Sequence, residues 1–258
     1  LLRAGETEWN ELHVVDLLPR GERADWRGRT YASVYSPANA RYQLVGEPAT
    51  GGGPLFATLR GEFQGAWGGQ ESSRANVEQR GDGFRAEIFV PVWTSQLYVS
   101  DWLQPGAMPL KAKVERSGNY LNVTVENLHP RDLTEARLVV NDHVHLLGSL
   151  PRGQSKTFQL DASRGDALNA IVQQQGNQFA SAVQQRRQAF GSQGFRLQAA
   201  AANVVAASFV SKLRAGQNAP HNYQNLFVTP ARFDLSPLVD RGDAVLLVWD
   251  AGHALTGE

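Results

Sequence analysis

The 258-residue chain contains no cysteine. Disulfide frameworks, zinc–thiolate sites, iron–sulfur clusters and cysteine nucleophiles are therefore excluded. The absence of cysteine does not identify a cellular compartment, since many periplasmic and many cytosolic domains do without it. From the residues that are present we expect no cofactor.

The sequence also lacks an excess of charge of either sign. Lys and Arg together number 25 and so do Asp and Glu, which gives a formal net charge of zero. A dedicated nucleic-acid binder needs surplus basic side chains to displace counterions from phosphates. A protein held on an anionic membrane surface needs them as well. We therefore expect neither kind of partner.

Long hydrophobic runs are missing too. No stretch approaches the roughly 18 apolar residues of a membrane-spanning helix. The chain opens on LLRAG without methionine and stops at HALTGE just after an apolar run. We read both ends as cuts in a longer protein and expect flanking membrane segments beyond them.

The first hundred residues show the patterns of β-strands and turns. In RTYASVYS (29–36), Tyr31, Ser33 and Tyr35 alternate with Ala32 and Val34, and this period of two is typical of a strand. Asp-Gly within GDG (81–83) lies between two strand-like runs and predicts a hairpin. We expect residues 1–107 to form an N-terminal β-sandwich-like subdomain, with a boundary at Pro105-Gly106 and Pro109.

From residue 110 the strands are about five residues long and are separated by turns every eight to twelve residues, which is typical of a β-sandwich. Apolar residues then recur at helical spacing in 166–188 and 197–213, and AVLLVWD (244–250) has the composition of a buried strand. We expect 108–258 to form a second β-sandwich subdomain with a helical insertion at about 162–215. The last strand should return to the second sheet. The predicted fold class is mainly β, with one or two β-sandwich (Ig-like) subdomains.

Motifs of catalysis are scarce. The chain has no G-x-S-x-G elbow, no H-E-x-x-H and no phosphate-binding glycine motif. The chain has many carboxylates, and its sequence does not give the distances between them. A pair of catalytic carboxylates, as in a glycosidase, therefore remains an alternative. His143 and His145 are two residues apart, so on a strand they would share a face and could bind zinc or copper if a third ligand joined them. Two ordinary strand histidines are the simpler interpretation.

Aromatic residues gather between 63 and 102. Aromatic faces on a β-sheet can stack on sugar rings, although rings more often fill the core because they bury a large area. The candidates for a sugar-binding surface are Trp67, Trp93, Tyr98 and Trp102. Trp67 lies in a glycine-rich stretch, where burial is least assured.

Residues 122–160, NVTVENLHPRDLTEARLVVNDHVHLLGSLPRGQSKTFQL, resemble a hairpin module of extracytoplasmic bacterial proteins. In that module a strand ending in V-x-N leads through a polar turn to an L-V-V strand, and an L-G-x-L-x-x-G-Q-S turn leads to the last strand. Segments 28–44 and 242–255 are similar to parts of large membrane-anchored bacterial proteins of unknown function. The matching residues in the module are Val125, Asn127, Leu138, Val139, Leu147, Gly148, Leu150, Gly153, Gln154 and Ser155. We expect Asn127 to turn the chain by bonding the nearby backbone.

The resemblance covers about half of the chain and implies a periplasmic or extracellular location and no catalytic residues. We therefore expect a non-enzymatic extracytoplasmic domain that binds a protein or polysaccharide partner in the cell envelope. A carbohydrate-binding module that uses exposed aromatics is the first alternative. A hydrolase or metal site around His143 and His145 is the second.

Overall fold

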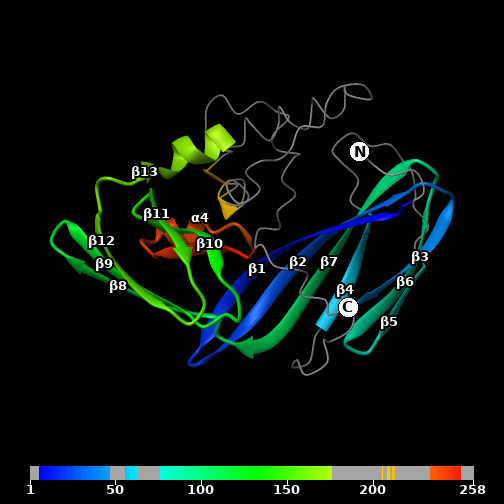
Figure 1. The fold of residues 1–258 in the computed structure, drawn as a ribbon, viewed down its shortest axis with the longest axis horizontal. Coiled ribbons are helices and arrows are strands. Elements are labelled where there is room, and N and C mark those ends of the chain that lie inside the picture. Colours follow the sequence, from blue (N-terminus) through cyan, green and yellow to red (C-terminus); the bar gives the residue numbers. More distant parts are fainter. Residues whose placement is uncertain are drawn as a thin grey trace. The chain divides into compact units, whose positions relative to one another are not determined.

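The computed structural model describes residues 6–46, 56–62, 76–175, 205, 208–209, 211–212 and 233–250. These residues form antiparallel β-sheets with little helix, so the expectation of a mainly β protein is confirmed (Figure 1). The chain divides into two compact units, which meet in sequence between Met108 and Pro109.

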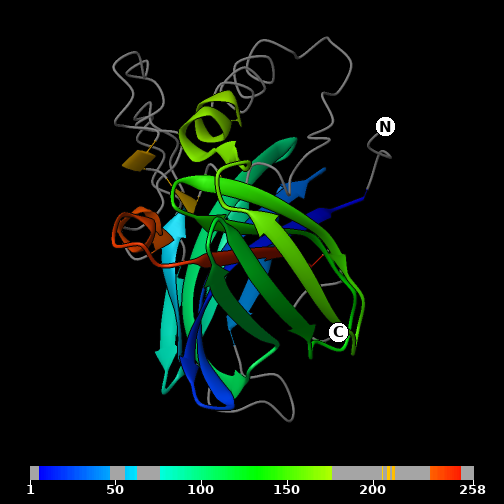
Figure 2. The ribbon, with the colours of Figure 1, turned by 90° about the vertical axis from the view of Figure 1, so that its left-hand side faces the viewer.

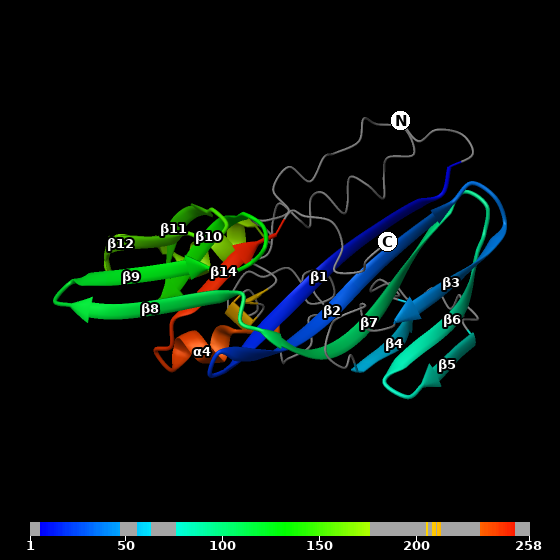
Figure 3. The same cartoon turned by 60° about the horizontal axis from the view of Figure 1, so that its bottom comes forward.

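The first unit is built on a four-stranded sheet of order β1-β2-β7-β4. Its strands are β1 (Glu8–Arg20), β2 (Arg23–Ser36), β7 (Thr94–Ala107) and β4 (Phe56–Glu62). β2 and β7 pair along their whole lengths, and Figure 3 shows them running beside β1 as three long ribbons. β2 is longer than the strand pattern of residues 29–36 predicts.

A three-stranded sheet of order β3-β6-β5 completes this unit. Its strands are β3 (Ala40–Gly46), β6 (Gly83–Val90) and β5 (Asn76–Arg80), and the predicted Asp-Gly hairpin joins β5 to β6. Both sheets of the unit contribute to one buried cluster. Its members are Val34, Leu44, Ala57, Phe84, Ala86, Ile88, Val90 and Tyr98.

β7 ends beside the boundary predicted at Pro105-Gly106 and Pro109. The strand continues through Pro105 and Gly106 to Ala107. β4 pairs with β7 only as far as Leu103, so beyond that point β7 has no described neighbour on its β4 side. A proline is tolerated in a strand where its missing N–H would face an unpaired edge. The pairing with β2 on the other side therefore carries the strand past Pro105.

The second unit contains two further sheets. One has the order β12-β9-β8, from β8 (Leu110–Ser117), β9 (Tyr120–Asn127) and β12 (Ser155–Asp161). The other has the order β13-β11-β10-β14, from β10 (Leu133–Val140), β11 (His143–Leu150), β13 (Asp166–Ala167) and β14 (Val245–Trp249). β14 pairs with β10, so the last strand returns to the second sheet as predicted.

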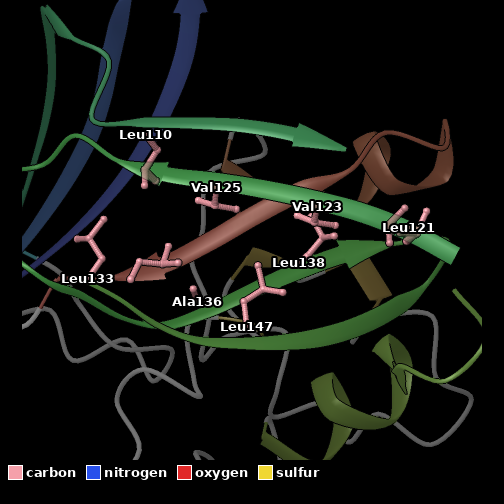
Figure 4. Packing of buried hydrophobic residues seen from close by; sticks show 10 residues of the cluster. Leu110, Leu121, Val123, Val125, Leu133, Ala136, Leu138 and Leu147 are labelled. Carbon is pink, nitrogen blue, oxygen red and sulfur yellow. The ribbon is translucent and has the colours of Figure 1, made fainter. Parts of the chain in front are cut away.

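These two sheets share a core, shown in Figure 4. Alternate residues of β9 point into it, because Leu121, Val123 and Val125 are buried while their neighbours are not. The facing sheet contributes Ala136 and Leu138, among others. Burial of these aliphatic side chains is the main favourable term in the stability of the unit.

The sheet that carries β10 is covered on its other face as well. Val139 and Val144 pack there against Leu168 and Val172 of a helix over 168–175 and against Val239 of α4 (Ser236–Asp240). Figure 2 shows the two helices beside this sheet. A strand covered on both faces needs consecutive apolar residues, which explains the runs in β10 and β14. Of the predicted insertion at 162–215, residues 168–175, 205, 208 and 211–212 are helical, and 176–204 lie outside the described residues.

The side chain of Asn127 joins neighbouring segments of the second unit through hydrogen bonds. Its side chain is fully buried, and its Nδ2 donates to the carbonyls of Arg131 and Leu150 at 3.0 and 2.7 Å. Its Oδ1 accepts from the His129 N–H at 2.9 Å. Because every polar atom of the amide has a partner, the burial of this side chain is compensated. The expectation that Asn127 turns the chain by bonding the backbone is confirmed.

Candidate functional site

Trp93 is the most unusual exposed residue of the first unit. It is the third residue of a tight turn closed by a hydrogen bond from the Thr94 N–H to the Pro91 carbonyl. Its φ is 60°, in the left-handed region that disfavours residues with a β-carbon. Its side chain nevertheless remains 63% exposed. The protein therefore holds a large aromatic side chain in solvent on a strained backbone.

Two hydrogen bonds join this turn to the turn at Ser36–Asn39, between β2 and β3. The Trp93 N–H donates to the Ser36 carbonyl at 2.8 Å. The Val92 N–H donates to Oδ1 of Asn39 at 2.9 Å. A strained conformation persists only where its surroundings determine it, and these contacts supply that constraint. Trp93 is thus presented by a rigid end of the sheet.

Several polar residues lie on the sheet face that points away from the core of the first unit, near the start of β7. Strand register places Glu8, Tyr35 and Ser95 in one row across β1, β2 and β7. Asn10, Ser33 and Leu97 form the next row of this register. We call Glu8, Asn10, Ser33, Tyr35 and Ser95 the outer strip.

Hydrogen bonds link members of the outer strip. Asn10 Nδ2 donates to Glu8 Oε1 at 2.8 Å, and the hydroxyls of Ser33 and Ser95 lie 2.9 Å apart. Both contacts are exposed to solvent. The alternation of residues 29–36 places Ser33 and Tyr35 on one face, but it does not connect them with Ser95. That connection needs the pairing of β2 with β7, which local patterns do not give.

The other aromatic candidates lie differently. Tyr98 is 1% exposed within the core, and its hydroxyl donates to Gln96, so its ring has no surface for a ligand. Trp102 is partly buried against the same core, and its indole N–H donates to Thr30 Oγ1 at 3.0 Å. Both rings therefore support the fold. Trp67 lies outside the described residues.

A chain of polar contacts continues from Thr30. Its Oγ1 is 2.7 Å from Nδ1 of His13, and Nε2 of His13 is 3.1 Å from Oε2 of Glu11. The contact with His13 lowers the pKa of the Glu11 carboxyl more than burial raises it. The order hydroxyl, imidazole, carboxylate has the connectivity of a nucleophile with its base and orienting acid.

This contact chain was not predicted, because Glu11 and Thr30 meet only through the register of β1 and β2. The Thr30 hydroxyl is already engaged by Trp102 and His13. Catalysis of acyl transfer also requires donors aimed at a developing oxyanion, and the described contacts supply none here. His13 Nδ1 and the Thr30 hydroxyl are thereby paired, whereas His13 Nε2 and Glu11 Oε2 are buried 3.1 Å apart without the geometry of a hydrogen bond.

His143 and His145 lie on β11 but in different surroundings. Nδ1 of His143 contacts the Asn141 carbonyl at 2.8 Å near the surface. His145 is buried, and its Nε2 has no hydrogen-bond partner among the described residues. Its ring abuts Gly165, where a β-carbon would lie 2.9 Å from Cε1. Burial lowers the pKa of His145, and the charge of His143 lowers it further, while Asp161 and Asp166 oppose the shift.

No group of three His, Asp or Glu side chains suited to a metal ion occurs within the described parts of the chain. The third ligand that the paired-histidine hypothesis requires is therefore not found beside His143 and His145 there. The neutral form that burial favours at His145 would suit a metal ligand. It suits a packed core histidine equally well.

A family model matches part of the chain. Residues 109–235 are covered by a domain whose description is "Domain of unknown function (DUF8725)". The match includes strands β8 to β13 of the second unit. No curated protein sequence matches the chain. Within the described residues, no helix is both long and apolar enough to cross a membrane.

Proposed function

We propose that this chain is a non-enzymatic binding domain that recognises a protein or polymer partner in the bacterial cell envelope. The observation that carries the proposal is Trp93, a residue that is 63% exposed and has a φ of 60°. The left-handed backbone conformation costs a residue with a β-carbon about 1–2 kcal/mol. An exposed ring contributes little to the stability of the fold and so offsets little of this cost. Binding is therefore the better explanation for the exposed ring.

The position of Trp93 supports binding rather than packing. Exposed tryptophans are enriched among the residues that dominate binding energies, because they bury a large area at a low entropy cost. The turn is already ordered by Ser36 and Asn39, so a partner would not have to order it. Such preorganisation increases affinity.

We infer that the second unit is a β-sandwich of Ig-like character. Support comes from the core between sheets β12-β9-β8 and β13-β11-β10-β14, and from their short antiparallel strands. Sandwiches commonly serve as rigid carriers of binding loops. The fold alone assigns no chemistry, and the site of action is therefore argued from Trp93.

We place the protein at the periplasmic or extracellular face of a bacterial membrane, to which segments flanking this chain would anchor it. The support is the resemblance of residues 122–160 to modules of extracytoplasmic proteins. Expression of the parent protein with a tag in this region, followed by protease treatment of intact spheroplasts, tests the location. Protection of the tag until the membrane is lysed would contradict it.

The binding proposal is tested by cosedimentation of the purified chain with bacterial cell envelopes. Trp93→Asn is the decisive variant, because asparagine tolerates a positive φ and keeps the turn. Trp9→Ala is the matched control: it removes another exposed indole of the same unit, one whose strand position lies opposite Val34 on the core side of the sheet. We expect the wild type and Trp9→Ala to sediment with envelopes and Trp93→Asn to remain in solution.

Two results would overturn the proposal. The first is equal sedimentation of Trp93→Asn and the wild type, or no sedimentation of either. The second is turnover of an envelope component by the wild type that His13→Gln abolishes. That result would assign a hydrolytic role to the Glu11–His13–Thr30 contacts.

A further inference from the structure

We propose that two copies of this chain associate through their β1 strands, which pair antiparallel about a two-fold axis at Val14. The four-stranded sheets of the two first units would then form one continuous sheet across the dimer. The inference concerns a second copy of the chain and does not depend on the proposed envelope partner.

The first step is the free edge of β1. This strand lies at one end of the sheet order β1-β2-β7-β4 (Figure 3), and no strand within the described residues pairs with its other edge. With 13 residues, it is the longest edge strand among the described sheets. It pairs with β2 at every position without a bulge. Its edge groups are therefore aligned as in a regular strand, which is a template for pairing with another chain.

The edge of β1 also lacks the usual protection. Natural sheets guard exposed edges with lysine, proline, a bulge or a charge that points inward. In the second unit, the edge strand β8 carries two lysines and the edge strand β12 carries one. β1 has no lysine, and its one proline is Pro19, next to its last residue. Glu11 points to the core side, where its carboxyl contacts His13 of the same strand. A long edge with so little protection indicates that a partner strand covers it.

The second step is the direction of the backbone groups of β1. Arg20 and Arg23 flank a two-residue turn in which Gly21 has a φ of 65°, and residues that flank such a turn form a hydrogen-bonded pair. Since directly opposite pairs alternate, the even-numbered residues of β1 bond to β2. The Ser36 carbonyl agrees with this alternation, because it accepts from the Trp93 N–H on the β7 side of β2. The residues of β1 whose backbone groups face the free edge are Trp9, Glu11, His13, Val15, Leu17 and Pro19, of which proline has no N–H.

The third step is the register. Odd-numbered residues of one copy must pair with odd-numbered residues of the other, because these carry the groups that face the edge. An axis at Val14, the middle residue of the strand, pairs all 13 residues of both copies. It sets Glu8 opposite Arg20 at each end of the interface. Moving the axis to His13 or Val15 separates these opposite charges and leaves two residues of each strand unpaired.

The side chains at the two ends are available for this ion pair. Arg20 is bonded through Nε to Asp25 at 2.7 Å, and its side chain is 74% exposed, so its remaining N–H groups face solvent. Glu8 accepts from Asn10 through Oε1, which leaves Oε2 for a partner. Two copies would therefore gain two such pairs without losing the contacts that each copy makes alone.

The remaining positions are compatible with the same register. Pairing about Val14 sets even-numbered residues opposite even-numbered ones, so both faces of the sheet continue across the dimer. Glu11 meets Leu17. Asp16 meets Leu12, so no acid stands opposite another acid. The pairing would form about ten main-chain hydrogen bonds, a number typical of a specific protein–protein interface.

The first test is the mass of the purified 258-residue chain by analytical ultracentrifugation over a series of concentrations. We expect a reversible dimer. Val15→Pro removes an N–H that faces the free edge and none that bonds to β2, so it should raise the dissociation constant of the dimer at least about ten-fold. Val15→Thr is the matched control, since it keeps the N–H and a β-branched side chain, and it should leave the constant unchanged.

Reversal of the end charges tests the register. Glu8→Arg and Arg20→Glu should each raise the dissociation constant about five-fold, because like charges then face each other. The Glu8→Arg/Arg20→Glu double variant should return to within about two-fold of the wild type. The contact of Arg20 with Asp25 is lost in the single and the double variant alike, so it cannot account for the recovery.

A single cysteine locates the axis, because the chain has none of its own. Residues opposite each other in a non-hydrogen-bonded pair have Cα atoms about 4.5 Å apart, which a disulfide can bridge. Val14→Cys should therefore form a covalent dimer on mild oxidation. Leu12→Cys is the control on the same face: its two copies would lie about 14 Å apart along the strands and should stay unlinked.

Three results would overturn the inference. They are a monomeric mass at every concentration, equal dimerisation of Val15→Pro and the wild type, and cross-linking of Leu12→Cys that matches or exceeds that of Val14→Cys. Circular dichroism and urea unfolding of each variant establish that the first unit remains folded. If Val15→Pro does not fold, the charge reversals and the two cysteine variants decide the question by themselves.

Discussion

Gly28 of β2 and Trp102 of β7 face each other across paired strands, and a β-carbon added to Gly28 would lie 1.9 Å from Cε2 of the indole. The indole therefore occupies the space that any other residue at position 28 would need. We expect Gly28→Ala to destabilise the first unit by about 2–3 kcal/mol, as for overpacking of a rigid site. Urea unfolding followed by tryptophan fluorescence measures this.

Gly106→Ala is the graded control, since its added β-carbon would lie 3.0 Å from Nε1 of Trp26 and demands a smaller shift. It should cost about 1 kcal/mol. Replacing Trp102 by leucine should reduce the cost of alanine at position 28. An unchanged cost in that background would show that the indole is not the cause.

Arg29 and Asp101 form a buried ion pair in the same unit. Two contacts join them, Nε to Oδ1 at 2.7 Å and Nη2 to Oδ2 at 3.0 Å, and both side chains are mostly shielded from solvent. Because an unpartnered buried charge is costly, Asp101→Leu and Arg29→Met should each lose about 3–5 kcal/mol. The double variant should be more stable than either single variant. Thermal or urea unfolding of the wild type, the two single variants and the double variant completes this double-mutant cycle.

The exposed pair Arg41–Glu87 is the control for this cycle. Its removal should change the free energy of unfolding by less than about 1 kcal/mol. Equal effects at the two pairs would contradict the role assigned to burial.

Asn127 should be sensitive to substitution. Alanine would leave the Arg131 and Leu150 carbonyls and the His129 N–H without their partner, at a cost of about 3 kcal/mol to the second unit. Asn127→Asp would also set a carboxylate against two carbonyls, so the defect of this variant should be larger at neutral pH than in acid. Urea unfolding of each variant at both pH values measures the difference.

The control for these variants is Thr124→Ala on the same strand. The Thr124 hydroxyl contacts Thr157 in solvent, so its removal should change the free energy of unfolding by less than about 0.5 kcal/mol. A comparable loss at the two positions would show that burial of the Asn127 amide is not what makes it sensitive.

The stability of the second unit should depend on pH through His145. Burial lowers the pKa of this imidazole in the folded state below its ordinary value of 6.5. Above about pH 6.5 both states are neutral and the free energy of unfolding is unaffected. As the pH falls below 6.5 the unfolded chain binds the proton first, so stability is lost until the folded pKa is reached. Urea unfolding at a series of pH values should show this slope.

His145→Leu should flatten that slope, whereas His143→Gln should retain most of it because His143 contributes only through its charge. A slope that persists in His145→Leu would assign it to another group.

Elemental analysis of the purified protein addresses the paired histidines directly. No third ligand joins them within the described residues, so we expect no stoichiometric zinc or copper. Stoichiometric metal that disappears in the His143→Ala/His145→Ala variant would contradict this and make β11 a functional strand.

The sequence predicts local structure well where one residue type determines the backbone. The predicted Asp-Gly hairpin joins β5 to β6, and Gly81 in its turn has a positive φ. Strand ends are predicted less well. Residues 23–28 are too polar to signal a strand, yet they belong to β2 because β1 and β7 pair with them on both sides.

The candidate site is predicted only in part, because it also depends on contacts between segments that are distant in the sequence. Trp93 could be named from its sequence, but its positive φ follows from hydrogen bonds to Ser36 and Asn39 in another turn. The outer strip combines residues of β1, β2 and β7, whose order depends on pairing between distant segments. Tyr98 and Trp93 are both aromatic and close in sequence, and only the packing of the two sheets separates the buried ring from the exposed one.

The return of β14 to β10 has a consequence for synthesis of the chain. Val139 pairs with Val245, so this edge of β10 lacks the partner it has in the described fold until the ribosome has made the residues that follow α4. Until then an apolar strand edge is open to pairing with other chains, which is a recognised route to aggregation. A chain truncated before Val245 should therefore accumulate in inclusion bodies even though the other strands of its sheet are intact.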